Sequence, residues 1–312
     1  MSIKLDLSQI DLFTHLPLGE LQKEYQANGR AFHVSAIEEE GHTYLFDGSK
    51  FCEYYLRLRN QSNPQENPEN PLTRRNIQHF TIYRFVEEPN GFEQVFTKKE
   101  ISDLQCLKVL IQDPHRSNAQ RGEFYSRIGF ALLEADRDEA IAALKEGARF
   151  DDRKAQKKLA AISKDESERL YWALRSWQTS ESPNIEDFHL CAHAFERCFA
   201  IENHDKFAFY FYRKGALKGN PYCIAKIISY YELEYGVSKD DHKAMLWRQM
   251  LPVEWQERPI VEFMRHICQD RLILEKSMDH ISFPAELLEG IEEIDSNSIL
   301  PLVEPKEQSK KL

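Results

Sequence analysis

The sequence lacks closely spaced cysteines. No CxxC pair occurs among its 312 residues, and its cysteines are scattered along the chain: Cys52, Cys106, Cys191, Cys198, Cys223 and Cys268. Structural zinc modules and disulfide-rich domains both need cysteines at short spacings. The pattern therefore disfavours both classes and is typical of free thiols in a reducing compartment.

An excess of positive charge is also missing. The 41 Lys and Arg residues are outnumbered by 51 Asp and Glu residues, so the formal net charge is −10. Because binding to nucleic-acid phosphates requires a basic surface, we expect no nucleic-acid partner.

Long apolar runs are absent as well. The first residues, MSIKLDLSQIDLF, carry acidic side chains where a signal peptide needs an unbroken apolar core. No apolar stretch reaches the length of a membrane span. We therefore expect no transmembrane segment and a protein that works in the cytosol.

Glycine and proline are scarce, with 12 and 13 residues, whereas 42% of the chain is hydrophobic and 12% aromatic. This composition can bury a core that is dominated by helix. The length suggests two domains, or one small domain with an extended array. No Gly-rich phosphate loop and no supported Ser/His/Asp or Cys/His arrangement is found, so no cofactor is expected.

The N-terminal third mixes strand and helix signals. Residues 9–28 predict a first helix, and the runs AFHVSAI and HTYLF, on either side of EEEG, predict a β-hairpin. Asp47 or Ser49 caps a helix whose apolar face holds Phe51, Tyr54, Tyr55 and Leu58. The stretch 60–71, NQSNPQENPENP, predicts an exposed loop because each proline restricts the residue before it.

Residues 79–88 read as a strand or a short helix, which the pattern does not separate. Thr97 and Glu100 form a capping box that opens a further helix, KKEISDLQCLKVLIQ. The stretch DPHRSN at 113–118 ends that helix and marks a domain boundary.

After residue 119 the pattern becomes repetitive. Ala140 and Ala208 are 68 residues apart, and Ala208 and Ala244 are 36 apart. Small residues that recur at this period indicate helix pairs packed closely in an α-solenoid. We expect four pairs, at about 119–149, 152–178, 185–217 and 220–251.

One stretch of this array, YYELEYGVSKDDHKAMLWRQM at 230–250, resembles the Sel1-like repeat, a relative of the tetratricopeptide (TPR) repeat. The matching residues are Tyr231, Gly236, Val237, Asp240, Lys243, Ala244 and Trp247. One glycine of the family is replaced by Glu234 or a neighbour. The resemblance implies structural roles for these residues and a protein-binding surface on the array.

Residues 32–77 resemble the U-box, the zinc-free relative of the RING domain of ubiquitin ligases. The matches to its two motifs are Gly41, Thr43 and Tyr44, and then Asn70, Pro71, Leu72, Thr73 and Arg74. In a second register, Phe46 and Asp47 take the places of a Tyr-Asp pair. The family's first loop has no clear counterpart, although Leu21 or Tyr25 lies at about the right distance.

The resemblance implies an E3 ubiquitin ligase, a RING/U-box-type transferase without a covalent intermediate. Such a domain binds a charged ubiquitin-conjugating enzyme (E2) and orients the tethered ubiquitin. Pro71 and Leu72 would form one wall of the E2 groove, and Phe51, Tyr54 and Tyr55 the other. Arg74 would be the catalytic residue, since its fork of donors can reach E2 and ubiquitin together.

Simpler interpretations compete with this one. Pro-Leu-Thr-Arg is a common turn, and a Tyr-rich helix is more often core than groove, so residues 1–115 can instead be a cap on a non-enzymatic scaffold. His189 and His193, with Cys191 and Cys198 nearby, have a metal-like spacing but apolar surroundings, which favours a packed repeat helix. A metal-dependent hydrolase is disfavoured for the same reason.

The sequence thus predicts a mainly α protein with a small α+β U-box-like domain (1–115), a Sel1/TPR-like α-solenoid (116–256), capping helices (257–295) and a disordered tail (296–312). The expected partners are an E2, ubiquitin and an unknown protein substrate on the repeats. Because the Sel1-like repeat family is widespread in bacteria, the resemblance, together with the Lys/Asn/Glu-rich composition, also implies a translocated effector of an intracellular bacterium such as Legionella, secreted into the host cytosol.

Overall fold

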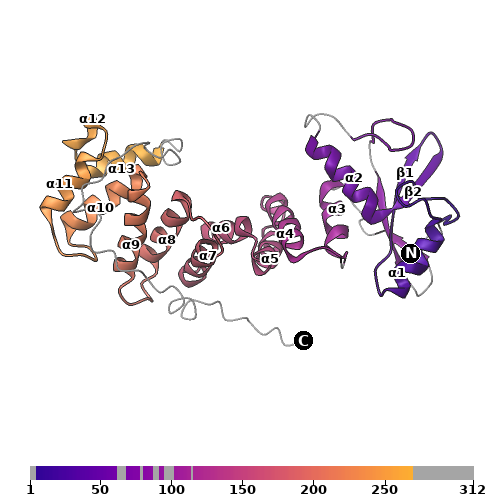
Figure 1. The fold of residues 1–312 in the computed structure, drawn as a ribbon, viewed down its shortest axis with the longest axis horizontal. Coiled ribbons are helices and arrows are strands. Elements are labelled where there is room, and N and C mark those ends of the chain that lie inside the picture. Colours follow the sequence, from indigo (N-terminus) through magenta and orange to yellow (C-terminus); the bar gives the residue numbers. More distant parts are fainter. Residues whose placement is uncertain are drawn as a thin grey trace. The chain divides into compact units, whose positions relative to one another are not determined.

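The computed structural model describes residues 5–61, 68–77, 80–86, 91–94, 102–113 and 115–269. The chain divides into two compact units, Met1–Asp152 and Arg153–Leu312, each described by itself. Figure 1 shows its elements, which are mostly helical. The predicted domain limits at 115, 256 and 295 stay predictions, and Thr97, Glu100 and the tail 296–312 lie outside the described residues.

A four-stranded antiparallel sheet forms the centre of the first unit, in the order β2-β1-β3-β4. Its strands are β1 (His33–Glu39), β2 (His42–Asp47), β3 (Thr81–Val86) and β4 (Gly91–Gln94). The predicted hairpin is confirmed, with Val34 opposite Asp47 and Glu39 opposite His42. Within residues 79–88, for which the sequence allowed a strand or a short helix, residues 81–86 form a strand.

Three helices accompany the sheet: α1 (Leu18–Ala27), α2 (Gly48–Gln61) and α3 (Ser102–Ile111). The helix predicted over 9–28 is wrong in its first half, because Pro17 opens α1 and the Asp11 side chain holds residues 13 and 14 in a turn. The predicted start of α2 is confirmed, since the Asp47 carboxylate accepts a hydrogen bond from the Lys50 amide at 2.8 Å.

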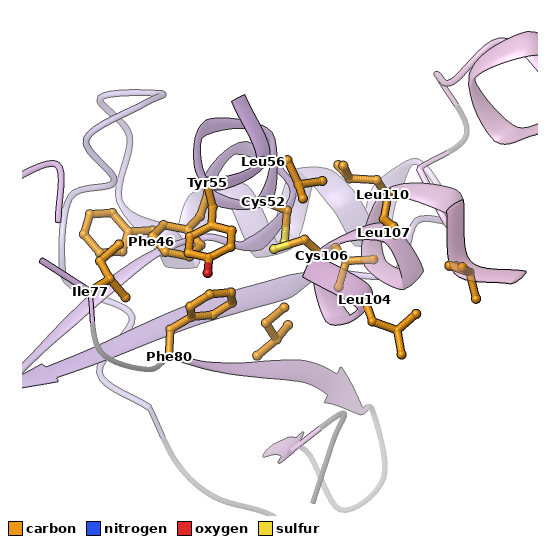
Figure 2. Close-up of a cluster of buried hydrophobic side chains, with 14 of the residues drawn as sticks. Phe46, Cys52, Tyr55, Leu56, Ile77, Phe80, Leu104, Cys106, Leu107 and Leu110 are labelled. Carbon is orange, nitrogen blue, oxygen red and sulfur yellow. The ribbon is translucent and has the colours of Figure 1, made fainter. Parts of the chain in front are cut away.

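Alternation along the strands gives the sheet two apolar faces. Val34, Ala36 and Leu45 pack with α1, whereas Ile37 and Phe46 pack with α2 and α3. The second cluster is shown in Figure 2. It continues into the first helix pair through Ile128, Leu132, Ala140 and Ala143.

The four predicted helix pairs are confirmed. They are α4 (Asn118–Leu132) with α5 (Arg137–Arg149), α6 (Arg153–Ile162) with α7 (Glu166–Gln178), α8 (Ile185–Arg197) with α9 (His204–Leu217), and α10 (Pro221–Leu233) with α11 (Asp241–Gln249). In the second unit consecutive pairs pack on each other, α7 on α8 and α9 on α10. Two helices, α12 (Val253–Gln256) and α13 (Ile260–Gln269), follow, and α13 packs on α10.

The residues that predicted the repeats lie in the repeat core. Ala140 and Ala208 are fully buried, as is Trp247. Gly236 has a left-handed backbone, and a side chain there would meet the main chain of Asp205 at 2.8 Å. Glu234, at the position of a family glycine, is also left-handed, with φ of 56°. Glutamate therefore holds a conformation that glycine adopts without strain.

Candidate functional site

The loop at 68–77 is fastened to the β1–β2 hairpin by one carboxylate. Glu39 accepts a hydrogen bond from the Asn70 side-chain amide at 2.8 Å and another from the Thr73 hydroxyl at 2.7 Å. Arg75 forms an ion pair with Glu40, the next residue of the hairpin. The loop therefore has a defined shape that its own sequence alone does not impose.

Within the loop, Asn70 makes the central contacts. It is fully buried, its side chain accepts from the Leu72 amide at 3.0 Å, and its carbonyl accepts from the Arg74 amide at 2.9 Å. Its own amide donates to the Arg75 carbonyl at 2.7 Å. Burial of Asn70, and of Pro68, corrects the prediction that the whole stretch 60–71 is exposed; residues 62–67 lie outside the described part.

Arg74 is exposed and has a left-handed backbone, with φ of 60°. Non-glycine residues adopt this conformation at a cost, and such residues cluster at functional sites. Leu72 beside it is 50% exposed, and Pro71 is half-buried. The predicted residues of this loop therefore lie together on one accessible turn.

A second loop, residues 9–17, is organised by Asp11. This fully buried carboxylate accepts from the amides of Phe13 (3.1 Å) and Thr14 (2.8 Å), and from the Asp47 amide at the end of β2 (2.8 Å). The loop presents Ile10, 67% exposed, and Leu16, 39% exposed. These two apolar side chains are held on a rigid turn.

Tyr54 connects the two loops across α2. Its hydroxyl donates to the Glu69 carbonyl at 2.9 Å, and its ring lies 5.6 Å from the ring of Phe13. Burial raises the pKa of Tyr54. The hydroxyl therefore stays protonated at neutral pH and keeps its role as a donor.

Two predicted groove residues are corrected. Phe51 is fully buried and Tyr55 is 7% exposed, with both rings packed on Phe80 at centroid distances of 4.9 and 4.8 Å. They face the sheet because they follow the apolar stripe of α2, so they support the surface from beneath. Of the three α2 residues proposed for contact, Tyr54 is the one with a partly open side chain.

The residues suggested for a first loop, Leu21 and Tyr25, also lie elsewhere. Leu21 is 4% exposed in the core between α1 and the sheet, and the Tyr25 ring packs edge-on against Phe32. Residues 9–17 were read as helix and so were missed. Two residues could have indicated a loop here: Pro17, and Asp11, whose side chain can cap the turn that follows it.

Two loops thus present exposed residues: Ile10 and Leu16 on the first, and the turn from Pro71 to Arg74 on the second. Tyr54 contacts both loops, through Phe13 and the Glu69 carbonyl. We call these residues together the loop surface. Its two polar networks interleave along the chain, since one joins residue 11 to 47 and the other joins 39 to 70 and 73. Such crossed links hold two loops on one sheet, a task that zinc performs in metal-bound modules.

The first network contains a second buried carboxylate. Asp47 is 1% exposed, and burial raises its pKa to about 6, with a smaller contribution from Asp11. The hydroxyl of Tyr25 bonds to Asp47, and burial raises the pKa of that tyrosine as well.

The two histidines with metal-like spacing, His189 and His193, are half-buried in the second unit. The rings of His189 and His193 lie 6.2 Å apart, and His189 meets Tyr222 edge-on at 5.0 Å. The Cys191 thiol donates to the Ala173 carbonyl, and burial lowers the pKa of His189 to about 4. Across the described ranges, no group of three or more His, Cys, Asp or Glu side chains is placed to hold a metal ion.

Within the part of the chain that the structure covers, none of the helices combines the length and apolar character needed to cross a bilayer. No protein-family model matches the chain, and no curated protein matches it.

Solved structures similar to this chain include two at 13% identity. One, a Sel1 repeat protein from Oxalobacter formigenes, has a TM-score of 0.39 and covers 57% of this chain and 78% of its own. The other is a protective antigen present in uropathogenic Escherichia coli strains, which displays an SLR fold. It has a TM-score of 0.37 and covers 61% of this chain and 47% of its own.

Proposed function

We propose that the loop surface binds a charged ubiquitin-conjugating enzyme and that the protein is an E3 ubiquitin ligase of the U-box type. The observation that carries this is the clamped loop at 68–77. Arg74 stands exposed on a turn that Glu39 holds through the side chains of Asn70 and Thr73, next to the Glu69 carbonyl held by Tyr54. A fixed turn supports catalysis by orientation, because the bound partners must be held in one pose.

Each exposed residue has a distinct part in this proposal. Ile10, Leu16 and Leu72, all well exposed, and the half-buried Pro71 supply apolar contact with the E2. The Arg74 guanidinium donates hydrogen bonds to both E2 and ubiquitin, a task that suits its planar fork of donors. The helix pairs recruit a protein substrate, as arrays of stacked helices commonly bind proteins on their surfaces.

A non-enzymatic scaffold is the second candidate, and one observation favours it. The core around α2 and α3 runs without a break into α4 and α5, through Ile128 and Leu132. A terminal cap must cover the apolar face of the first helix pair, and a sheet domain that shares its core with that pair does so. In that case the loop surface binds a protein partner without transferring ubiquitin.

The test is ubiquitin discharge by the full chain with a panel of charged E2 enzymes. In the ligase case Pro71→Ala weakens E2 binding, whereas Arg74→Ala leaves binding nearly intact. Arg74→Ala slows discharge about tenfold if about 1.4 kcal/mol of transition-state stabilisation is lost. Lys23→Ala, an exposed cation on α1, is the matched control and should leave both quantities unchanged.

The outcomes separate the two candidates. Binding of an E2 without accelerated discharge favours the scaffold, and absence of both binding and discharge with every E2 rejects the ligase. The location follows the function: a ligase works where charged E2 enzymes are present, which is the cytosol of a eukaryotic cell. Delivery there by a bacterium stays a prediction.

A further inference from the structure

Two buried thiols meet where α2 packs on α3. Cys52 and Cys106 have no exposed surface. Figure 2 shows them pointing toward each other, and a hydrogen bond joins the two side chains. The pair lies among Tyr55, Leu56 and Leu107 in the core of the first unit.

The other three cysteines with described side chains have different neighbours. The Cys191 thiol donates to the Ala173 carbonyl at 3.3 Å. Cys198 forms a hydrogen bond with Ser167, and the Cys223 sulfur lies against Gly215. Among the cysteines with described side chains, Cys52 and Cys106 are therefore the two that face each other. The packing of α2 on α3 brings them together, although they are far apart in the sequence.

We propose that Cys52 and Cys106 form a disulfide when the chain meets a disulfide oxidant, and that the bond is a redox-dependent clamp between α2 and α3. The proposal is independent of any ligase activity. It rests on the mutual orientation of the two thiols and on the rigidity of the two helices that carry them.

The chemistry is thiol–disulfide exchange with glutathione disulfide. The thiolate of one cysteine attacks a glutathione sulfur, breaks the S–S bond and releases one glutathione. The thiolate of the other cysteine attacks the resulting mixed disulfide and releases the second glutathione. The cysteine pair loses two electrons and two protons, and glutathione disulfide takes up these electrons and protons to become two glutathione thiols.

Burial decides when this happens. Apolar surroundings raise the pKa of the Cys106 thiol and exclude glutathione from the folded core. The folded, reduced chain is therefore slow to oxidise. The disulfide forms while the chain folds, or after a local opening of α3 has admitted glutathione. In both cases the packing of α3 on α2 then brings the two sulfurs together.

The bond would enclose a large part of the first unit. Cys52 and Cys106 are 54 residues apart, and the segment between them contains the clamped loop, β3 and β4. A crosslink of this length restricts the unfolded chain strongly and stabilises the fold. The clamp leaves the loop surface itself unchanged, because both sulfurs lie on the core side of their helices.

The experiment refolds the reduced, full-length chain in a buffer of reduced and oxidised glutathione and maps disulfides by mass spectrometry of non-reduced peptides. A Cys52–Cys106 peptide should be the dominant crosslink. The oxidised protein should unfold at a temperature roughly 5–10 °C higher than the reduced protein.

Variants make the result specific. Cys52→Ala and Cys106→Ser should each abolish the shift in midpoint, whereas Cys191→Ser, another buried cysteine, should retain it. Predominance of any other cysteine pair overturns the proposal. So does a shift that persists in both Cys52→Ala and Cys106→Ser, or a folded product that remains fully reduced.

Discussion

Arg74 combines an exposed side chain with a strained backbone. Its φ of 60° is a conformation that glycine adopts freely and arginine does not. Arg74→Gly should therefore raise the free energy of unfolding by about 0.5–1 kcal/mol. In the proposed ligase case it should also slow ubiquitin discharge about tenfold, as Arg74→Ala does. Chemical denaturation and a discharge assay on the same preparation check both effects.

The neighbouring arginine provides the comparison. Arg75 does not share the left-handed backbone and forms an ion pair with Glu40, so Arg75→Gly should lower stability. If Arg74→Gly destabilises the protein as well, the turn tolerates arginine without strain. The backbone conformation of Arg74 would then give no support to a functional role for this turn.

Asp47 gives the first unit a pH-dependent stability. Its folded pKa of about 6 lies above the ordinary value of 3.8, because burial disfavours the charged form. The folded protein therefore binds the Asp47 proton more tightly than the unfolded chain does. This contribution to stability is fully present below about pH 4 and is lost as pH rises through 6. At pH 7 Asp47→Asn should be more stable than the natural protein, by up to about 3 kcal/mol.

The difference between the two proteins should shrink as the pH falls from 7 to 4. Asparagine keeps a side-chain oxygen that can accept from the Lys50 amide, so the helix cap is retained. Urea unfolding at several pH values measures the effect. A difference that does not vary between pH 4 and 7 would show that Asp47 titrates normally.

At the scale of elements, Glu39 is the contact on which the 68–77 loop depends. Glu39→Ala leaves the buried Asn70 amide without its acceptor, which should cost about 1–3 kcal/mol. Hydrogen exchange at the amides of Arg74 and Ile77 should speed up markedly, since both are bonded inside the loop.

Glu38 is the matched control, because it is exposed on the same strand. Glu38→Ala should leave exchange in the loop unchanged. Equal acceleration in the two variants would mean that the hairpin, and not the carboxylate of Glu39, determines the loop conformation.

Sequence patterns predicted the regular elements well, for a physical reason. Apolar side chains at helical spacing predict helices, and capping residues such as Asp240 predict where each helix begins. The four helix pairs could therefore be predicted from the sequence. The hairpin is similar, because β-branched and aromatic runs enclose a turn at Glu40 and Gly41. Local chemistry determines these elements.

The loop surface was predicted only in part, because distant residues build it. Pro71, Leu72 and Arg74 were proposed from their local motif, and their role stays a prediction. The partner of that motif, Glu39, and the loop at 9–17 depend on contacts between segments more than 30 residues apart. Phe51 and Tyr55 were misplaced because a helical stripe indicates an apolar face but not whether a sheet covers it.

At the scale of the whole molecule, the two compact units should respond separately to damage. Trp247 is fully buried, so Trp247→Ala opens a cavity and should cost about 3–5 kcal/mol. Because repeats contact mainly their neighbours, hydrogen exchange should rise in α9 to α13 and stay unchanged in residues 5–152. A uniform rise along the chain would contradict the division into units.

The first compact unit extends past residue 115, the predicted limit of the N-terminal domain, and that limit stays a prediction. The unit runs to Asp152 and includes α4 and α5, whose side chains Ala140 and Ala143 belong to the core beneath the sheet. A boundary near 115 was predicted from the turn DPHRSN.

The interleaved networks have a consequence for the order of folding. Each network takes one partner from the β1–β2 hairpin and the other from a loop 31 to 36 residues away. Hairpins form within microseconds, whereas contacts between distant segments form later. The hairpin should therefore be structured in the transition state and the loops should dock after it. Substitutions in the hairpin should then slow folding, and substitutions in either loop should mainly accelerate unfolding.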